Sequence, residues 1–303
     1  MPWIQYHNGN YRVFINTNNG TKIRYTKNSF FSPNRPESID VKISNCCFYN
    51  CKYCHEGSSS YGEIAQLTNV INFADTLPPY TEIAVGGGDI MNTVYHTEMI
   101  LKIFKEHKAL CSITVHQNDF IKKYETIKRW IDEKLIYGVG VSLHNVDDPD
   151  LWKLLNKTPT AILHIIAGIA TAHELEEIVN HHAKVLILGY KILRRGVSYK
   201  ENFKEKILVN QQQLMDYRDK LFNNCKVCSF DNLALDQLKI KEYLKINGVN
   251  IWDKYYMGDD GTSTFFVDLV TMQYAKSSTS KTRYCFSEFD SVQSMYDTIR
   301  KEN

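Results

Sequence analysis

The spacing of hydrophobic positions changes repeatedly along the chain and predicts strands that alternate with helices. Short apolar runs rich in β-branched residues lie at 39–43, 82–85, 112–115, 137–142, 162–166 and 184–188. Amphipathic stretches with helical spacing lie between them, at 64–77, 97–110, 119–134, 148–155 and 171–182. Apolar strands separated by amphipathic helices are typical of βα units, so the pattern predicts an α/β fold with a parallel sheet.

Six βα units are too few for a complete eight-stranded barrel, and further elements flank them. Residues 1–37 contain β-rich runs joined by the hairpin signal Asn8–Gly9, and a polar linker ends this segment. A long helix is predicted at 202–222. Residues 225–303 are expected to form a small C-terminal α+β extension, with a strand at 229–235, a helix at 238–246 and a hairpin at 264–275.

The composition narrows the class of protein. Hydrophobic residues make up 43% of the chain and charged residues 23%, which is ordinary for a globular protein with a hydrophobic core. A net charge of +2 argues against nucleic acid as a partner. The longest apolar stretches, such as 161–170, are too short to span a bilayer. The first residues lack a basic start followed by an apolar stretch, so we expect a cytoplasmic protein without a membrane partner.

Three cysteines carry the strongest chemical signal in the chain. Cys47, Cys51 and Cys54 follow the pattern C-x3-C-x2-C within eight residues. A loop this short can wrap three thiolates around one cubic [4Fe–4S] cluster. Proteins that only transfer electrons usually supply four cysteines, so three ligands leave one iron open for a small molecule.

Other uses of these cysteines stay open at this point. Cys46 and His55 flank the three, so a non-enzymatic zinc-binding or interaction protein could use the loop 46–55. Zinc sites usually pair two short ligand clusters, and the second candidate is Cys225 with Cys228. Disulfides are disfavoured, because eight cysteines in 303 residues are too sparse for a secreted disulfide scaffold.

The cysteine spacing, with the aromatic Tyr53 just before the last cysteine, resembles that of the radical SAM enzymes. The resemblance implies a partial (β/α)6 TIM-like barrel over residues 38–224, carrying a [4Fe–4S] cluster and S-adenosylmethionine. It further implies an enzyme that takes an electron from a flavodoxin- or ferredoxin-like donor. This electron would cleave S-adenosylmethionine to a 5′-deoxyadenosyl radical, which abstracts hydrogen from an unidentified small molecule, nucleotide or peptide.

The resemblance also implies where S-adenosylmethionine binds. Gly86, Gly87, Gly88 and Asp89 end the second strand, where relatives hold the amino and carboxylate groups of the methionine half. The family usually has Gly-Gly-Glu at this point, so Asp89 is a departure. Tyr53 is expected to offer backbone contacts to the adenine.

Polar and apolar residues at the ends of the later strands complete the expected site. Ser142 is the preferred contact to the ribose or the methionine carboxylate, with Asn118 beside it and Gln117 and His144 as further candidates. Ile166 and Leu188 end the fifth and sixth strands, where the family packs apolar residues against adenine.

Several residues beyond the sixth strand have two interpretations each. Lys191, Arg194 and Arg195 could meet an anionic group at the barrel mouth or form a solvated loop. Cys225, Cys228 and Cys285 could bind an auxiliary cluster, but three cysteines favour buried free thiols. The C-terminal extension, including Asp268, Tyr274 and residues 277–280, is expected to cover the substrate side.

Overall fold

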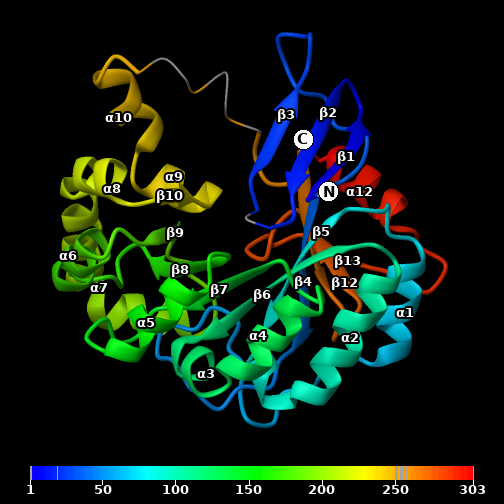
Figure 1. Ribbon diagram of the computed structural model, residues 1–303, viewed down its shortest axis with the longest axis horizontal. Coiled ribbons are helices and arrows are strands. Elements are labelled where there is room, and N and C mark those ends of the chain that lie inside the picture. Colours follow the sequence, from blue (N-terminus) through cyan, green and yellow to red (C-terminus); the bar gives the residue numbers. More distant parts are fainter. Residues whose placement is uncertain (1, 19, 250–251, 253–255, 257, 303) are drawn as a thin grey trace.

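A ten-stranded sheet organises the molecule (Figure 1). The computed structural model describes residues 2–18, 20–249, 252, 256 and 258–302. The six predicted strands are present as β4 (Ser38–Ser44), β5 (Glu82–Gly87), β6 (Leu110–His116), β7 (Gly138–Ser142), β8 (Ala161–Ile166) and β9 (Lys184–Leu188). All six are parallel and follow chain order across the sheet, which confirms the predicted βα arrangement.

Four more strands extend this sheet at its two ends. They are β10 (Val227–Phe230), β11 (Thr264–Asp268), β12 (Gln273–Ala275) and β13 (Tyr284–Cys285). β10 continues the parallel order beside β9, whereas β11 returns to pair with β4, and β12 and β13 follow antiparallel. The predicted hairpin at 264–275 is therefore confirmed. The predicted strand at 229–235 is shorter, because a helix begins at Asn232 behind the capping Asp231.

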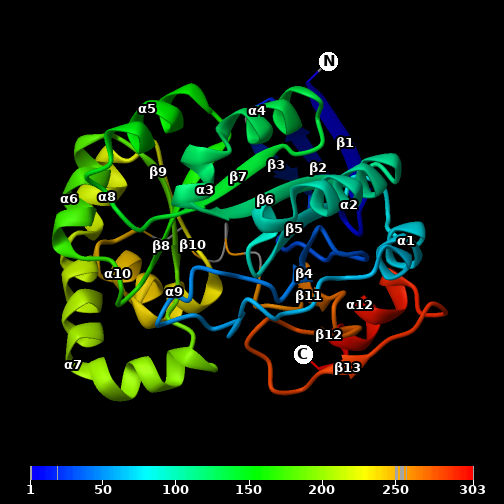
Figure 2. The same ribbon diagram turned by 90° about the horizontal axis from the view of Figure 1, so that it is seen from below.

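Helices lie outside the curved sheet, and its inner face is left to the strands and loops (Figure 2). The helices of the βα units are α1 (Leu67–Asp75), α2 (Val94–Glu106), α3 (Gln117–Lys122), α4 (Tyr124–Asp132), α5 (Pro149–Lys157) and α6 (Ala172–Asn180). The later helices are α7 (Arg195–Asp216), α8 (Arg218–Asn224), α9 (Asn232–Gln237), α10 (Ile240–Ile246) and α12 (Val292–Arg300). A short 3₁₀ helix, η1 (Ile90–Thr93), precedes α2.

Two helix predictions are corrected by the structure. The single helix predicted at 119–134 is divided at Lys123, whose φ of −113° is not helical. A short helical segment from Arg195 precedes the helix predicted at 202–222 and joins it at a kink, where Phe203 has a non-helical φ of −133°, and the separate α8 follows after Tyr217. Residues 195–201 are mostly polar, so the hydrophobic pattern gave no sign of the first two turns.

Alternation along β4 places polar groups inside the barrel. Ile39, Val41 and Ile43 belong to the main hydrophobic core between sheet and helices. Asp40 and Lys42 therefore lie on the opposite, inner face of the strand, as successive strand residues must. The interior of the curved sheet is accordingly polar enough to bind a ligand.

The N-terminal β-hairpin unit is a separate antiparallel sheet of β1 (Trp3–Asn8), β2 (Tyr11–Asn16) and β3 (Lys22–Tyr25), as predicted. Its small core joins Tyr11, Val13 and Ile15 to Leu110 of the main sheet. Glu37 is 1% exposed and accepts hydrogen bonds from Tyr11 and Arg24, with 2.8 Å to the Arg24 Nη2. A buried ion pair thus fastens the small sheet to the chain just before β4.

Among the described residues, no helix combines the length and the apolar character needed to cross a membrane.

Candidate functional site

The cysteines lie in the loop between β4 and α1, at the carboxyl end of the first barrel strand. This loop folds back on itself through backbone hydrogen bonds. The Cys47 amide donates to the Ser59 carbonyl at 2.9 Å, and the Cys54 amide donates to the Cys51 carbonyl at 3.2 Å. These bonds give the loop a defined shape before any metal is considered.

Three of the four neighbouring cysteines face one pocket. Cys47, Cys51 and Cys54 all line it, whereas Cys46 does not. The Cys46 sulfur points away from the pocket. It lies 3.7 Å from the Ser60 carbonyl oxygen and 4.0 Å from the side-chain Nδ2 of Asn92. Burial raises the pKa of both Cys47 and Cys51. Three converging thiols with no fourth cysteine at the pocket are a donor set that fits a [4Fe–4S] cluster with one open iron.

The glycine turn after β5 packs directly on the backbone that leads into the cysteines. The Gly88 amide donates to the Ser44 carbonyl at 2.6 Å, and the Asp89 amide donates to the Cys46 carbonyl at 2.7 Å. Gly87 has a φ of 125°, and a Cβ there would collide with the Ser44 oxygen. A Cβ at Gly88 would collide with the Cys46 oxygen. Glycine is therefore required at both positions for the two loops to meet.

Asp89 is buried at the edge of the pocket and caps η1 by accepting a hydrogen bond from the Met91 amide at 3.0 Å. Burial, helped by the negative charge of Asp119, raises the pKa of Asp89 well above its ordinary value. Asp119 is itself held by the Tyr49 hydroxyl at 2.6 Å and by the Lys123 ammonium at 2.7 Å. Two carboxylates thus lie close together beside the glycine turn.

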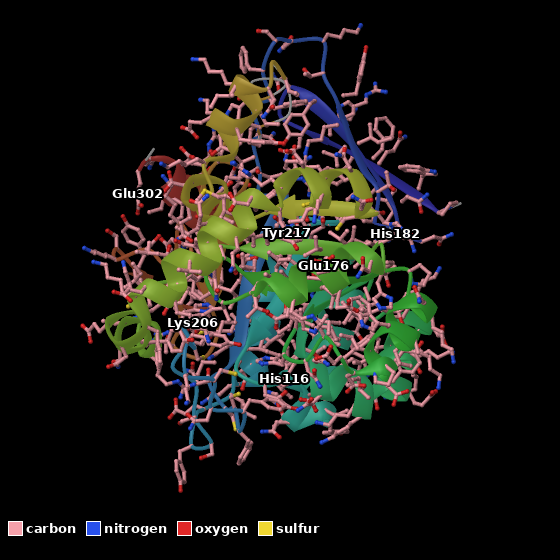
Figure 3. The ribbon with its side chains drawn as sticks, turned by 90° about the vertical axis from the view of Figure 1, so that its left-hand side faces the viewer. His116, Glu176, His182, Lys206, Tyr217 and Glu302 are labelled. Atoms are coloured by element: carbon pink, nitrogen blue, oxygen red, sulfur yellow. The ribbon has the colours of Figure 1, made fainter. Side chains whose placement is uncertain are left out.

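An aromatic stack forms another wall of the pocket. The rings of Tyr49 and His116 are parallel, with centroids 3.6 Å apart, and His144 stacks on the other face of His116 at 3.8 Å. Figure 3 shows His116 beside the loop that carries the cysteines. Burial, with the neighbouring His144, lowers the pKa of His116 to about 4. Both His116 and Tyr49 escaped the sequence analysis, because nothing in the local pattern marks them.

The ligand atoms of Cys51, His116 and His144 lie within 4.8 Å of one another, which raises the possibility of a zinc site among the described residues. The ring geometry argues against it. A metal ion must lie in the plane of each imidazole that binds it, and these two planes are stacked with only 19° between them. The His116 Nδ1 also accepts a hydrogen bond from the Asn118 amide at 3.1 Å. The histidines are therefore better placed to pack than to share a metal.

The remaining predicted residues fall into two groups. Tyr53, Gly87, Gly88, Asp89, Ser142, Ile166 and Leu188 all line the pocket, and so does His144. Gly86 and Asn118 are not among the lining residues, and the Asn118 side chain is exposed. Gln117 is buried and accepts hydrogen bonds from the backbone amides of His144 and Asn145, so it shapes the loop after β7.

Buried charges hold the end of the cysteine loop in place. Glu56 accepts a hydrogen bond from Lys42 at 2.7 Å and lies 3.5 Å from Arg194. Lys42 also lies 3.4 Å from Asp268 of β11. The loop is thereby tied to β4, to β11 and to the start of α7. The carboxylate of Asp268 is therefore engaged by this ion network, and Asp268 does not line the pocket that contains the cysteines.

The basic residues after β9 contact the cysteine loop. Lys191 reaches the His55 Nε2 at 3.5 Å and the Ser278 hydroxyl at 2.9 Å, and Arg195 donates to the Asn50 side chain at 3.0 Å. The solvated-loop interpretation therefore does not describe Lys191 or Arg195.

The C-terminal cysteines do not gather in one place. Cys225 ends α8 and Cys228 lies in β10, whereas Cys285 lies in β13 at the other end of the sheet. Burial raises the pKa of Cys225 to about 11 and of Cys228 to about 12. Because Cys285 lies far from the other two along the sheet, these positions match the interpretation as free thiols.

Comparison with known proteins adds to this geometry. No protein-family model and no curated protein matches the chain. Among solved structures, SuiB of Streptococcus suis bound to S-adenosylmethionine matches 99% of this chain and 89% of its own, with a TM-score of 0.62 and 13% identity.

The protein anSMEcpe with bound AdoMet matches 88% of this chain and 81% of its own, with a TM-score of 0.53 and 14% identity. Its complex with AdoMet and the peptide Kp18Cys gives a TM-score of 0.54 and 15% identity, over 88% of this chain and 80% of its own. The chain therefore shares the α/β fold of these S-adenosylmethionine-bound proteins, which confirms the predicted fold class.

Proposed function

We propose that this protein is a radical SAM enzyme, in which Cys47, Cys51 and Cys54 hold a [4Fe–4S] cluster. The observation that carries the proposal is the convergence of these three thiols, without Cys46, on a pocket bordered by the glycine turn. The cluster, when bound, supplies the electron that cleaves S-adenosylmethionine to a 5′-deoxyadenosyl radical, which then takes hydrogen from the substrate.

The protein's own residues would bind and orient the nucleotide. The turn from Gly86 to Asp89 would receive the amino and carboxylate groups of the methionine half. The paired carboxylates of Asp89 and Asp119 favour a positively charged amine, because a cation between them relieves their mutual repulsion. His116, stacked between two rings, would stay neutral and keep that wall apolar.

The opposite side of the pocket suits the nucleoside. Ser142 lines the pocket and offers a hydroxyl to the ribose or the carboxylate, and Asn118 remains a further candidate for the same contact. Ile166 and Leu188 offer apolar surface to adenine, and Tyr53 offers backbone groups. We propose that residues 225–303 cover the side of the pocket where the substrate binds.

A peptide is the first substrate class to examine, because one solved neighbour is complexed with a peptide. The electron donor would be a flavodoxin- or ferredoxin-like protein, and a reduced cytoplasm would protect the cluster from oxygen.

The proposal is tested by anaerobic reconstitution followed by metal analysis. The wild-type protein should be brown and contain about four irons and four sulfides per chain. With dithionite it should form 5′-deoxyadenosine. Cys51→Ala should abolish this cleavage, whereas Cys46→Ala should leave it largely unchanged, because the Cys46 sulfur faces away from the pocket.

Two results would end the proposal. One is a colourless protein that retains a single tightly bound zinc, which would favour the zinc-binding or interaction protein instead. The other is undiminished cleavage by Cys51→Ala.

A further inference from the structure

Two hydrogen-bond donors beside the cysteine loop are buried without an acceptor. The first is Ser58, which is 3% exposed and lines the pocket together with the three cysteines. Its hydroxyl oxygen is buried and bonds to no atom of the described chain. Ser58 follows Cys54 by four residues, so the hydroxyl belongs to the same loop as the thiols.

The second donor is the guanidinium of Arg195 at the start of α7. One of its nitrogens, Nη1, donates to the Asn50 side chain, immediately before Cys51. The other two, Nε and Nη2, are buried and have no partner in the described part of the chain. Burial raises the pKa of the Cys51 thiol, and the charge of Arg195 acts on that thiol in the opposite direction. The unsatisfied side of the guanidinium therefore lies within electrostatic reach of a proposed cluster ligand.

Such donors are unusual in a folded protein. More than about 90% of buried polar groups have a partner, and a buried donor without one costs about 1–3 kcal/mol. Ser58 and Arg195 come from different parts of the chain: Ser58 lines the pocket with the three cysteines, and Arg195 binds the Asn50 side chain directly before Cys51. The simplest resolution is an acceptor that binds there. Cluster sulfides and cysteine thiolates are acceptors, and hydrogen bonds to them are known to set cluster potentials.

We propose that the Ser58 hydroxyl and the Arg195 guanidinium donate hydrogen bonds to sulfur atoms of the cluster held by Cys47, Cys51 and Cys54, and so raise its reduction potential. This inference rests on the proposed function. Reduction adds negative charge to the cluster, and donors aimed at its sulfurs stabilise that charge.

The chain provides a matched control for each donor. Ser59 is the exposed neighbour of Ser58, and its hydroxyl has no assigned bond. Arg194 is the neighbour of Arg195, but its guanidinium is already engaged by the His55 carbonyl and Glu56. The variants to compare are therefore Ser58→Ala against Ser59→Ala, and Arg195→Gln against Arg194→Gln.

The reduction potential of the reconstituted cluster is the main measurement. Ser58→Ala and Arg195→Gln should each lower the equilibrium constant for reduction at least tenfold, which is about 59 mV for a one-electron couple. Arg195→Lys, which keeps the charge and some donors, should restore part of the loss. The two controls should shift the potential by less than a third as much. Equal shifts in both members of a pair would overturn the inference, because they would reflect loop stability or general charge.

A second measurement on the wild-type protein avoids variants that lose the cluster. With ¹⁵N-labelled arginine, pulsed electron paramagnetic resonance of the reduced cluster should show coupling to a guanidinium nitrogen. Exchange into D₂O should reveal exchangeable protons at hydrogen-bond distance from the cluster. Absence of the nitrogen coupling would overturn the role of Arg195. If Ser58→Ala left the potential unchanged and weakened only S-adenosylmethionine binding, the hydroxyl would serve the nucleotide and its proposed role would be wrong.

The outcomes separate this inference from the proposed function. A wild-type protein that holds no cluster refutes both. A wild-type protein with a cluster and normal cleavage, but with potentials unaffected by Ser58 and Arg195, refutes only the role given to these donors.

Discussion

Gly87 adopts a backbone conformation that side chains rarely allow, and it does so where the glycine turn meets the cysteine loop. Its φ of 125° and its contact with the Ser44 carbonyl leave no room for a methyl group. Gly86, one residue earlier, has open space around the position of its missing Cβ. The fold therefore requires glycine at 87 but leaves room for a side chain at 86. The motif alone does not show this difference.

This difference gives a matched pair of substitutions. Gly87→Ala should lower the free energy of unfolding by about 2–4 kcal/mol, because it adds backbone strain to a collision with a carbonyl oxygen. Gly86→Ala should change it by less than about 1 kcal/mol. Urea unfolding of the metal-free protein measures both. Equal losses would show that the turn can relax and that Gly87 has no special role in seating the loop.

At the residue scale, the spacing of residues is the signal from which the sequence selects candidates. Cys47, Cys51 and Cys54 could be selected because three thiols within one short loop have few uses. The sequence could not select His116, Ser58 or the buried, unpartnered nitrogens of Arg195. Their importance depends on which neighbours the fold brings to them. The outward turn of Cys46 was equally hidden, since adjacent cysteines differ only in the direction of their side chains.

At the scale of elements, strand ends are what the pattern predicts best. The six apolar runs of the barrel each became a strand, and their carboxyl ends gather at the pocket. Helix limits were less accurate. α3 and α4 are separated at Lys123, and α7 begins two turns early with polar residues that no hydrophobic period marks. Those residues carry Arg195, which the sequence marks only as one of three basic residues after the sixth strand.

The junction between the N-terminal sheet and the barrel is an element-scale contact that pH should control. Burial would raise the pKa of Glu37, but the hydrogen bonds and charge of Arg24, with Lys22, hold it below its ordinary value. A carboxylate whose pKa is lower in the folded state stabilises it above the unfolded pKa of about 4.3, and loses that effect as the pH falls.

Glu37→Gln tests this junction. At pH 7 it should destabilise the protein by about 3 kcal/mol, since it leaves the partly buried Arg24 without its counter-charge. The difference should shrink as the pH falls below the unfolded pKa of about 4.3, and the two proteins should converge only below the lowered folded-state pKa of Glu37, where both carry a neutral group. Unfolding curves at several pH values give the difference. Glu106→Gln, on an exposed helix surface, serves as the control, and a gap that stayed constant with pH would contradict the ion-pair explanation.

At the scale of the whole molecule, the return of β11 to the side of β4 is the feature that the sequence could not reveal. Local patterns identified the hairpin at 264–275, but nothing in them names the strand with which it pairs. In the structure, Val267 and Phe265 enter the same core as the barrel strands, and Tyr296 of α12 packs with them. The C-terminal residues thus extend the sheet and add side chains to its core.

Truncation distinguishes these two contributions. A chain ending at residue 248 would expose the edge of β4 and remove buried residues from the main core, so it should be insoluble or lack cooperative unfolding. A chain starting at residue 28 keeps the main sheet intact and should still unfold cooperatively. Circular dichroism and thermal melts compare the two. Normal folding of the chain ending at 248 would mean that the residues after 248 are dispensable for the fold of the main sheet.

In the described part of the chain, the main sheet ends at β10 on one side and at β13 on the other, and no backbone pairing joins these two strands into a closed ring. Side-chain hydrogen bonds span the gap between the two ends of the sheet. Asn232 of α9 donates to Asp260, and Lys191, which follows β9, donates to Ser278. In a closed barrel, a ligand can reach the interior only through the open ends. Here only side-chain hydrogen bonds span part of the wall. If those bonds part, the middle of a long polymer could enter from the side without a free end and without breaking any strand pairing.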